Sequence, residues 1–379
     1  MLRGQNRILK GASSYFGYEV INLEKVVVGM SGGVDSAVAA LLLKKSGYDV
    51  VGVTLRTWQS DEDYANRCCD IDDARSTAHR IGIDYYPVNC TSDFQRFVVE
   101  PFKNSYVRGL TPNPCIECNR YVKWEKLLYY SKVVGAKYIA TGHYASVVKL
   151  DNGRYTVKQA EHAEKDQTYM LWKLTQDQLE STLMPLGSLS KTEVREIAKE
   201  AGLPVASKPD SQEICFVTNG SYADYIEGAR ADGDTEGYFI DTQGNILGRH
   251  RGIIHYTVGQ RKGIGLALGY PVYVKEIRAK TNEVVLCGEQ SLYGKEIICS
   301  DVNFMSIPGL KTGEELACSV KIRYRHQAQP AIIAAANDGS VKISFSSPVR
   351  AATPGQSAVF YDSENRIIGG GVITIICDA

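Results

Sequence analysis

The 379-residue chain has no long apolar run: nowhere do about 18 apolar residues, the length that spans a membrane, follow one another. Its first twenty residues include basic positions but no apolar core followed by a small-residue cleavage site, so they do not resemble a secretory signal. No low-complexity tract interrupts a composition of 44% hydrophobic and 23% charged residues, which argues against disorder. We therefore expect a globular, cytoplasmic protein that does not associate with membranes.

The chain also lacks a strong charge bias and a regular cysteine pattern. Its formal net charge is +0, which argues against a surface that binds polyanions everywhere but allows a local basic patch. The ten cysteines show no regular spacing, so we expect reduced thiols, some of them metal-binding or catalytic, instead of a secreted disulfide framework. The length favours two or three domains.

Short apolar runs alternate with amphipathic stretches in the first part of the chain. The predicted strands are EKVVVGM, DVVGVTLRTW, DYYPVNC and AKYIATGHY, and the predicted helices are VDSAVAALLLKKSGY, DIDDARSTAHRIGI and SDFQRFVVEPFKNSYVRG. This alternation predicts an α/β fold with a parallel sheet covered by helices on both faces. Ligands of such sheets bind at the carboxyl ends of the strands, where we expect SGGVDS, CIECN and TGHY.

After about residue 212 the pattern changes to apolar runs joined by turn residues. The segments GYFIDTQGNILG, PVYVKEIRAKTNEVVLCG, PAIIAAANDGSVKISFS and SAVFYDSENRIIGGGVIT each predict a β-hairpin. We expect a catalytic domain over residues 1–212, a small β-rich domain over 213–288 and a C-terminal β-barrel over 289–379.

The segment GMSGGVDS has the composition of a phosphate-binding loop. Gly32 and Gly33 leave the backbone N–H groups free to point into one concavity, and the following helix adds its positive end. Ser31 and Ser36 supply hydroxyl donors, and Asp35 can position Mg²⁺. The pattern G-x-x-x-x-G-K-S/T is absent, so phosphoryl transfer of that kind is not implied. The alternative is a plain strand-to-helix turn.

Cys115 and Cys118 lie three positions apart in TPNPCIECN. Such a pair suits a metal, a redox disulfide or a nucleophile. Zinc is disfavoured because a structural zinc site takes four protein ligands and no second CxxC exists to complete one. A redox pair would need a thioredoxin-like context, which the sequence lacks.

GMSGGVDS resembles the signature of PP-loop ATP pyrophosphatases, which split ATP between the α and β phosphates. Further motifs follow in the order found in bacterial tRNA-specific 2-thiouridylases: TPNPCIECN, YIATGHYA, KDQTYML, KPDSQEICF, HYTVGQRKGIG, KIRYR and TPGQSAVFY. The resemblance covers nearly the whole chain. It implies an enzyme that uses ATP to adenylate the C2 oxygen of the wobble uridine in a tRNA anticodon loop and then replaces that oxygen by sulfur.

The resemblance also implies a set of site residues. The nucleotide site would comprise Gly29, Met30, Ser31, Gly32, Gly33, Val34, Asp35, Ser36, Leu55 and Gly142. The pocket for the target base would comprise Asn113, Pro114 and Cys115, and the tRNA contacts Lys165, Asp166, Gln167, Arg323 and Tyr324. If KIRYR is a strand, Lys321, Arg323 and Arg325 share one face.

The cysteines are the point where the chain departs from the best-known pattern. By resemblance, Cys215 matches a persulfide carrier and Cys118 the residue that releases its sulfur by forming a disulfide. At the position of Cys115, the well-studied enterobacterial members of the family that this chain resembles have an aspartate. With three cysteines, Cys115, Cys118 and Cys215 could instead hold a 4Fe-4S cluster, which we favour modestly over the relay. Either route needs a sulfur donor such as a cysteine desulfurase or a sulfur-relay protein.

Two other functions would also fit part of the sequence. Another PP-loop enzyme, a ligase or synthetase that acts on an adenylated carbonyl, explains the glycine loop but neither the cysteines nor the β-rich part. A non-catalytic RNA-binding iron–sulfur protein explains the cysteines and leaves the nucleotide site a regulatory role. The dependence of AMP formation on tRNA separates the three hypotheses.

Overall fold

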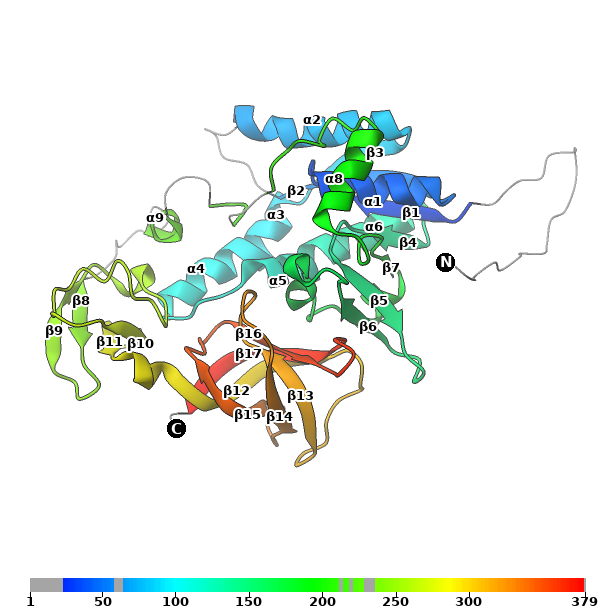
Figure 1. Cartoon of the computed structure of the whole chain (residues 1–379). Helices are drawn as coiled ribbons and strands as arrows, with labels where there is room; N and C mark the ends of the chain where they lie inside the picture. The colour runs from blue at the N-terminus through cyan, green and yellow to red at the C-terminus, as the bar shows by residue number, and fades with distance from the viewer. Residues whose placement is uncertain (1–22, 58–63, 211–213, 218–220, 228–235, 378–379) are drawn as a thin grey trace, which may run out of the picture.

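The computed structural model describes residues 23–57, 64–210, 214–217, 221–227 and 236–377. Along the chain these residues form a helix-covered parallel sheet, then a small mixed sheet, then a closed barrel (Figure 1). The predicted fold class, an α/β parallel-sheet domain followed by a small β-rich part and a C-terminal barrel, is confirmed.

The parallel sheet provides the edge at which a ligand would bind. Its strands are β1 (Lys25–Gly29), β2 (Asp49–Arg56), β3 (Asp84–Asn89), β4 (Tyr138–Ala140) and β7 (Thr182–Leu183). They pair in parallel in the order β3-β2-β1-β4-β7. The chain moves outward from β1 to β3 and then returns to the other side of β1 with β4. The strand order therefore reverses between β1 and β4, and SGGVDS and TGHY follow these two strands.

Helices cover both faces of this sheet, as predicted. The longer ones are α1 (Val34–Lys45), α2 (Tyr64–Ile81), α4 (Glu100–Val107), α6 (Trp124–Val133) and α8 (Lys191–Glu200). Ala40 of α1 and Ala78 of α2 pack with Val28 on one face, and Leu127 of α6 packs with Val27 on the other. Because both faces are covered, β1 is a continuous apolar run instead of an alternating one. None of the described helices is long and apolar enough to cross a membrane.

Shorter elements complete the N-terminal part. They are α3 (Thr91–Phe94), the π-helical turn η1 (Gln95–Val99), α5 (Pro114–Cys118), the π-helical turn η2 (Asn119–Lys123), the 3₁₀ turns η3 (Ala163–Lys165) and η4 (Thr168–Met170), and α7 (Gln176–Glu180). A hairpin of β5 (Ala145–Lys149) and β6 (Tyr155–Gln159) follows the TGHY segment. The α5 helix, η2 and α6 run in direct succession, so Cys118 lies on a helix that packs against the sheet.

The small sheet contains the first two predicted hairpins. Its strands are β8 (Gly237–Ile240), β9 (Ile246–His250), β10 (Tyr273–Arg278) and β11 (Glu283–Cys287), and α9 (Tyr222–Glu227) and η5 (Ile253–His255) lie beside it in sequence. The β8–β9 and β10–β11 pairs are antiparallel, which confirms both hairpins. Phe239 and Val274 from this sheet share one apolar core with Phe94 and Phe102 of the helices that follow β3. The small sheet is therefore packed against the catalytic part.

The C-terminal barrel contains the other two hairpins. It comprises β12 (Tyr293–Phe304), β13 (Glu315–Lys321), β14 (Gln329–Ala335), β15 (Val341–Arg350), β16 (Ser357–Tyr361) and β17 (Ile367–Cys377), preceded by η6 (Glu289–Leu292). The β14–β15 and β16–β17 pairs are antiparallel, as predicted. A Cβ on Gly370 would lie 2.7 Å from Trp172, so the glycine allows this indole to pack against β17. The domain boundaries at 212/213 and 288/289 stay predictions.

The prediction that KIRYR is a strand is wrong. Strand β13 ends at Lys321, and residues 322–326 form bends and turns. Ile322 is buried, and the Arg323 side chain turns inward to donate hydrogen bonds to Val258 O, Ala351 O and Thr353 Oγ1. None of these three acceptors belongs to a strand that pairs with β13. The chain therefore leaves the barrel sheet after Lys321, where Arg323 turns toward them. A row of Lys321, Arg323 and Arg325 on one strand face does not exist.

Candidate functional site

The loop between β1 and α1 has the geometry of an anion site. Gly32 has φ 73°, a left-handed conformation that glycine adopts without strain. The Ser36 hydroxyl accepts a hydrogen bond from Ser31 N at 3.1 Å and donates one to Gly33 O at 3.1 Å, which closes the loop. No side chain caps the N-terminus of α1, so its first N–H groups and its dipole are available to phosphate oxygens.

The segment after β4 packs directly on this loop. A Cβ on Gly142 would lie 2.6 Å from Ser36 N and 2.9 Å from Asp35 O. Only glycine allows an approach that close, so this position forms one wall of the phosphate site. Met30 is buried, and Leu55, at the end of β2, is half-buried, so both lie on the same carboxyl edge as the loop.

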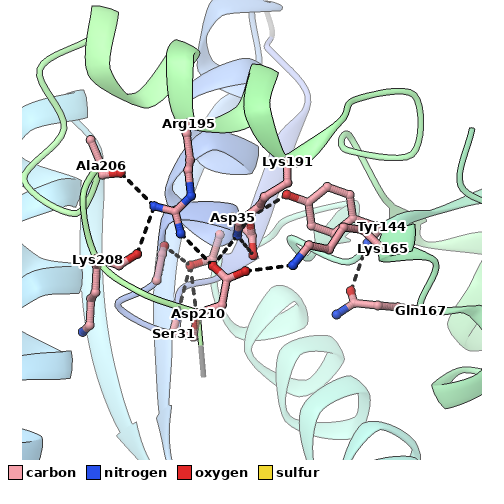
Figure 2. Close-up of polar contacts among 12 residues, drawn as sticks. Ser31, Asp35, Tyr144, Lys165, Gln167, Lys191, Arg195, Ala206, Lys208 and Asp210 are labelled. Atoms are coloured by element: carbon pink, nitrogen blue, oxygen red, sulfur yellow. Dashed lines mark hydrogen bonds and ion pairs between the residues drawn. The ribbon is translucent and has the colours of Figure 1, made fainter. Parts of the chain in front are cut away.

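Sequence reasoning missed a cluster of charges beside the loop (Figure 2). Lys191 Nζ lies 2.7 and 2.9 Å from the two carboxylate oxygens of Asp35, and Tyr144 donates a hydrogen bond to the same carboxylate at 2.7 Å. Lys191 also pairs with Asp210 Oδ1 at 2.7 Å. One feature of the sequence could have indicated the start of α8. Ser190 and Glu193 form a capping box, which places Lys191 at the first position of this helix.

Asp210 is the most heavily paired carboxylate in this cluster. Besides Lys191, it pairs with Arg195 at 3.0 Å and with Lys165 at 2.9 Å. Burial alone would raise its pKa, but the hydrogen bonds from Lys191 and Lys165 outweigh burial and lower the pKa to about 2. Burial, and the hydrogen bond to Asp35, raise the pKa of Tyr144, so this hydroxyl stays protonated at neutral pH. The cluster thus gathers Lys191, Arg195 and Lys165 around the carboxylates of Asp35 and Asp210.

The cysteine motif begins at the N-terminus of α5. Asn113 caps this helix by accepting a hydrogen bond from Cys115 N at 3.2 Å, and Pro114 occupies its first position. Cys118 is buried, whereas Cys115 and Cys215 are exposed. The sequence TPNPC therefore ends in a fixed turn that presents Cys115 to solvent.

The Cys118 thiol is affected by burial and by the other two thiols. Burial raises the pKa of Cys118 to about 12; Lys123 opposes this rise, and Cys215 and Cys115 add to it. Atoms packed around the exposed Cys115 thiol also raise its pKa. The structure thus brings the predicted trio to one neighbourhood. Among the described residues, no group of three or more histidine, cysteine, aspartate or glutamate side chains is arranged to hold a metal ion.

His143 connects the two halves of the site. Its Nδ1 lies 2.8 Å from Thr141 Oγ1, and its ring centroid lies 5.4 Å from that of Trp124 in the helix that follows Cys118. Burial, together with Lys123, lowers the pKa of His143 to about 3, so the ring is neutral at physiological pH. The TGHY segment therefore contacts the glycine loop through Gly142 and the start of α6, the helix that follows the cysteine motif, through His143.

The residues predicted to bind tRNA differ in their burial and in the contacts that their side chains make. Asp166 is buried, and its carboxylate accepts hydrogen bonds from Thr168 Oγ1 and Ala160 N, so it shapes the local turn. Gln167 accepts a hydrogen bond from Tyr144 N at 3.0 Å, and Lys165 pairs with Asp210. Arg323 is turned inward, as described above.

The barrel reaches the cysteine loop through several contacts. Gln356 Nε2, just before β16, donates a hydrogen bond to Thr111 O at 2.8 Å. Thr111 N donates to Pro354 O at 2.9 Å, and Lys173 pairs with Glu117 at 2.7 Å and with Asp301 at 2.6 Å. The loop that leads into Asn113, Pro114 and Cys115 is thus in direct contact with the barrel.

Comparison with known proteins supports this architecture. Three family descriptions match in order: "tRNA methyl transferase HUP domain" at residues 24–219, "tRNA methyl transferase PRC-barrel domain" at 224–288 and "Aminomethyltransferase beta-barrel domain" at 294–373. The tRNA-specific 2-thiouridylase MnmA of Lachnoclostridium phytofermentans is 51% identical over 93% of this chain and 99% of its own length. This chain belongs to the tRNA-specific 2-thiouridylase family. The MnmA of Acetivibrio thermocellus is also 51% identical, over 92% of this chain and 99% of its own.

The 2-thiouridylase relatives align with the three structural parts of this chain together, because they span nearly its whole length. Among solved structures, the U34-tRNA thiolase NcsA of Methanococcus maripaludis, solved with its 4Fe-4S cluster, is 20% identical. The match covers 52% of this chain and 61% of the NcsA chain, with a TM-score of 0.34. A structural similarity this low does not show whether the cysteines of this 2-thiouridylase family member hold a cluster.

Proposed function

We propose that this protein uses ATP to convert the C2 oxygen of a tRNA wobble uridine into an adenylate and replaces it by sulfur. One observation supports this most strongly: the TGHY segment contacts the glycine loop at Gly142 and, through His143, Trp124 at the start of α6, six residues after Cys118. Activation by ATP and attack by sulfur need neighbouring sites, because the adenylate must meet the thiol before water does.

The activation step follows from the chemistry of uracil. The C2 carbonyl is a weak electrophile, and its oxygen is a poor leaving group. In the first step the C2 oxygen bonds to the α-phosphorus of ATP as the bond to pyrophosphate breaks. The loop N–H groups, Ser31 and Ser36 hold the phosphates at the positive end of α1. Asp35 is the carboxylate at this loop, and with Mg²⁺ bound it would supply an oxygen ligand.

Sulfur transfer then uses the chain's own thiols. The terminal sulfur of a persulfide on Cys215 bonds to C2 as the bond from C2 to the AMP oxygen breaks. Cys118, on losing its proton, attacks the Cys215 sulfur, which breaks the bond to the transferred sulfur and leaves 2-thiouridine. A thiol reductant later reduces the Cys118–Cys215 disulfide. A sulfur donor, such as a cysteine desulfurase or a relay protein, recharges Cys215 in the cytoplasm.

A 4Fe-4S cluster on Cys115, Cys118 and Cys215 would supply sulfide in place of the persulfide. Cysteine thiolates are the usual ligands of iron in such clusters. The described side chains are not arranged as a set of three ligands, so the proposed reaction does not include a cluster. Iron and acid-labile sulfide, measured per chain after oxygen-free purification, decide between the routes. Thiolation without iron supports the persulfide route, whereas iron and activity lost together in Cys115→Asp support the cluster.

The proposed function is tested by supplying unmodified tRNA, ATP and a cysteine desulfurase with L-cysteine, which delivers sulfane sulfur to Cys215. We expect AMP and pyrophosphate to form only with tRNA, and a thiolated uridine to appear at the wobble position by nucleoside mass spectrometry. Cys118→Ser and Cys215→Ser should abolish thiolation but retain ATP binding. AMP formation without tRNA would favour another PP-loop synthetase, and no AMP with tRNA would favour a non-catalytic RNA-binding protein.

A further inference from the structure

The loop that enters β10 joins the small sheet to the barrel. Val258 of this loop and Tyr273 of β10 form one buried apolar cluster with Leu292 of η6 and Ala351, which follows β15. Gly259 has φ 87°, and a Cβ on it would lie 2.9 Å from the Cβ of Ala351. Glycine therefore allows the loop to pack directly on the barrel, and the junction between the two parts is dry.

Three arginines surround this junction. The guanidinium carbons of Arg261 and Arg350 lie 6.0 and 5.3 Å from the centroid of the Tyr273 ring. A Cβ on Gly259 would lie 3.5 Å from Arg323 Nη2 and 3.8 Å from Arg350 Nη1, so these two guanidinium groups are neighbours. Arg261 comes from the loop before β10, whereas the other two follow β13 and end β15. The junction thus brings together like charges from both parts.

Carboxylates neutralise these charges only weakly. Within the part of the chain that the structure describes, Glu289 is the one acidic partner of the three arginines, and it lies 3.6 Å from Arg350 and is 53% exposed. Burial, and the charge of Arg350, lower the pKa of Arg323. The N–H groups of Arg323 already bind acceptors of the protein, whereas the Arg261 side chain is exposed. Like charges held together in this way favour an anionic partner.

The chemistry of the partner follows from arginine and from the position of the junction. A guanidinium group donates two parallel hydrogen bonds to a phosphate, and an RNA backbone offers phosphates in a row. Gly355 packs on Thr111, in the loop that leads to Cys115, since a Cβ on Gly355 would lie 2.8 Å from Thr111 N. Gly355 follows Arg350 by five positions, so their Cα atoms are at most about 18 Å apart. A tRNA that inserts a base beside Cys115 brings the flanking phosphates to this region.

We propose that Arg261 and Arg350 form a binding surface for phosphates of the tRNA backbone, at the junction of the small sheet and the barrel. The small sheet thereby takes part in substrate binding, because Arg261 lies in the loop that enters it. Arg323 supports this surface by holding Ala351 O and Thr353 Oγ1, next to Arg350. Such contacts orient the tRNA without reading its sequence. This inference rests on the proposed function, which makes tRNA the substrate.

The test measures the affinity for unmodified tRNA by fluorescence anisotropy at several KCl concentrations. Each phosphate contact that is lost should make the slope of log K against log salt shallower by about 0.7–0.9. Arg261→Gln and Arg350→Gln should each show this change and bind at least about fivefold more weakly at low salt. Arg261→Lys keeps the charge and should retain the slope. Glu289→Gln should bind tRNA more tightly, because it frees Arg350 from its carboxylate partner.

Arg75→Gln is the matched control. Arg75 is an exposed arginine paired with Asp72 on α2, which lies at the opposite end of the molecule from the barrel (Figure 1). Its replacement should change neither slope nor affinity. Arg261→Gln should unfold at the wild-type urea concentration because the side chain is exposed, so weaker binding would not reflect a folding defect. Arg261→Gln and Arg350→Gln variants that both bind as Arg75→Gln does would overturn the surface. A wild type that binds no tRNA would overturn the proposed function itself.

Discussion

At the scale of single residues, Cys118 differs from the other two cysteines of the trio by its burial. It is 7% exposed and shares an apolar core with Phe94, Phe102 and Val122. A thiol in such surroundings favours its neutral form, which is inert as a nucleophile. The proposed role of Cys118 as the attacking thiol thus requires that the substrate complex change its surroundings or supply a base.

We predict that Cys118 in the ligand-free protein reacts with iodoacetamide only at high pH. With a pKa raised to about 12 by burial, its thiolate fraction at neutral pH is about a thousandfold below that of an ordinary cysteine. Alkylation of Cys118, followed by peptide mass spectrometry, should still be rising above pH 10, with a cysteine peptide as control. A rate that levels off below pH 9 would show that burial does not hold the thiol neutral.

At the scale of elements, the loop after β4 packs closely against the first turn of α1, beside the glycine loop proposed to bind the nucleotide. Gly142 lies against Ser36 N and Asp35 O, which belong to the first turn of α1. The strand order places these two loops side by side because β1 and β4 are neighbours in the sheet. The site therefore depends on backbone proximity as much as on functional side chains.

We predict that Gly142→Ala lowers the free energy of unfolding by about 1–3 kcal/mol, because the added methyl must push the loop away from α1. The affinity for ATP should fall with it. Gly288→Ala is the matched control, since a Cβ there meets no atom within 4 Å and its φ is −72°. Equal stability of the two variants in urea unfolding would show that the close approach is not rigid.

At the scale of the whole molecule, Lys173 connects the cysteine helix to the barrel. It pairs with Glu117, between the two cysteines of the motif, and with Asp301 of β12, and its side chain is 9% exposed. Removing one member of a buried pair leaves its partners unpaired. The nearly buried lysine therefore ties the position of α5 to that of β12.

We predict that Lys173→Met lowers the free energy of unfolding by about 1–3 kcal/mol, less than for a fully buried pair because Asp301 is partly exposed. Burial lowers the pKa of Lys173, but Glu117 and Asp301 outweigh burial and raise it above its usual 10.5. The difference from wild type should therefore be constant below about pH 10 and shrink as the lysine deprotonates at higher pH. Lys25→Met, which loses an exposed pair, should cost less than about 0.5 kcal/mol. A Lys173→Met penalty as small as that of Lys25→Met would contradict the link.

The sequence predicted those features that depend on local pattern. Alternating apolar and amphipathic segments predicted the parallel sheet, and the glycines of SGGVDS predicted the loop that the structure shows between β1 and α1; phosphate binding by this loop stays a prediction. The cluster at Lys191 was missed because its contact with Asp35 joins residues 156 positions apart. KIRYR was assigned wrongly because the alternation of basic residues is the same in a strand as in a bend. Whether a strand or a bend forms depends on the acceptors of Arg323, which lie on distant segments of the chain.

The central claim, that the C2 oxygen of the wobble uridine attacks ATP, is tested most directly by following that oxygen. A tRNA labelled with oxygen-18 at C2 of the wobble uridine would be incubated with ATP, a cysteine desulfurase with L-cysteine and the protein, and the AMP would be analysed by mass spectrometry. We predict that each thiolation event transfers the label into the phosphate of AMP. Unlabelled AMP, with the heavy oxygen retained in the tRNA or released to water, would contradict the account.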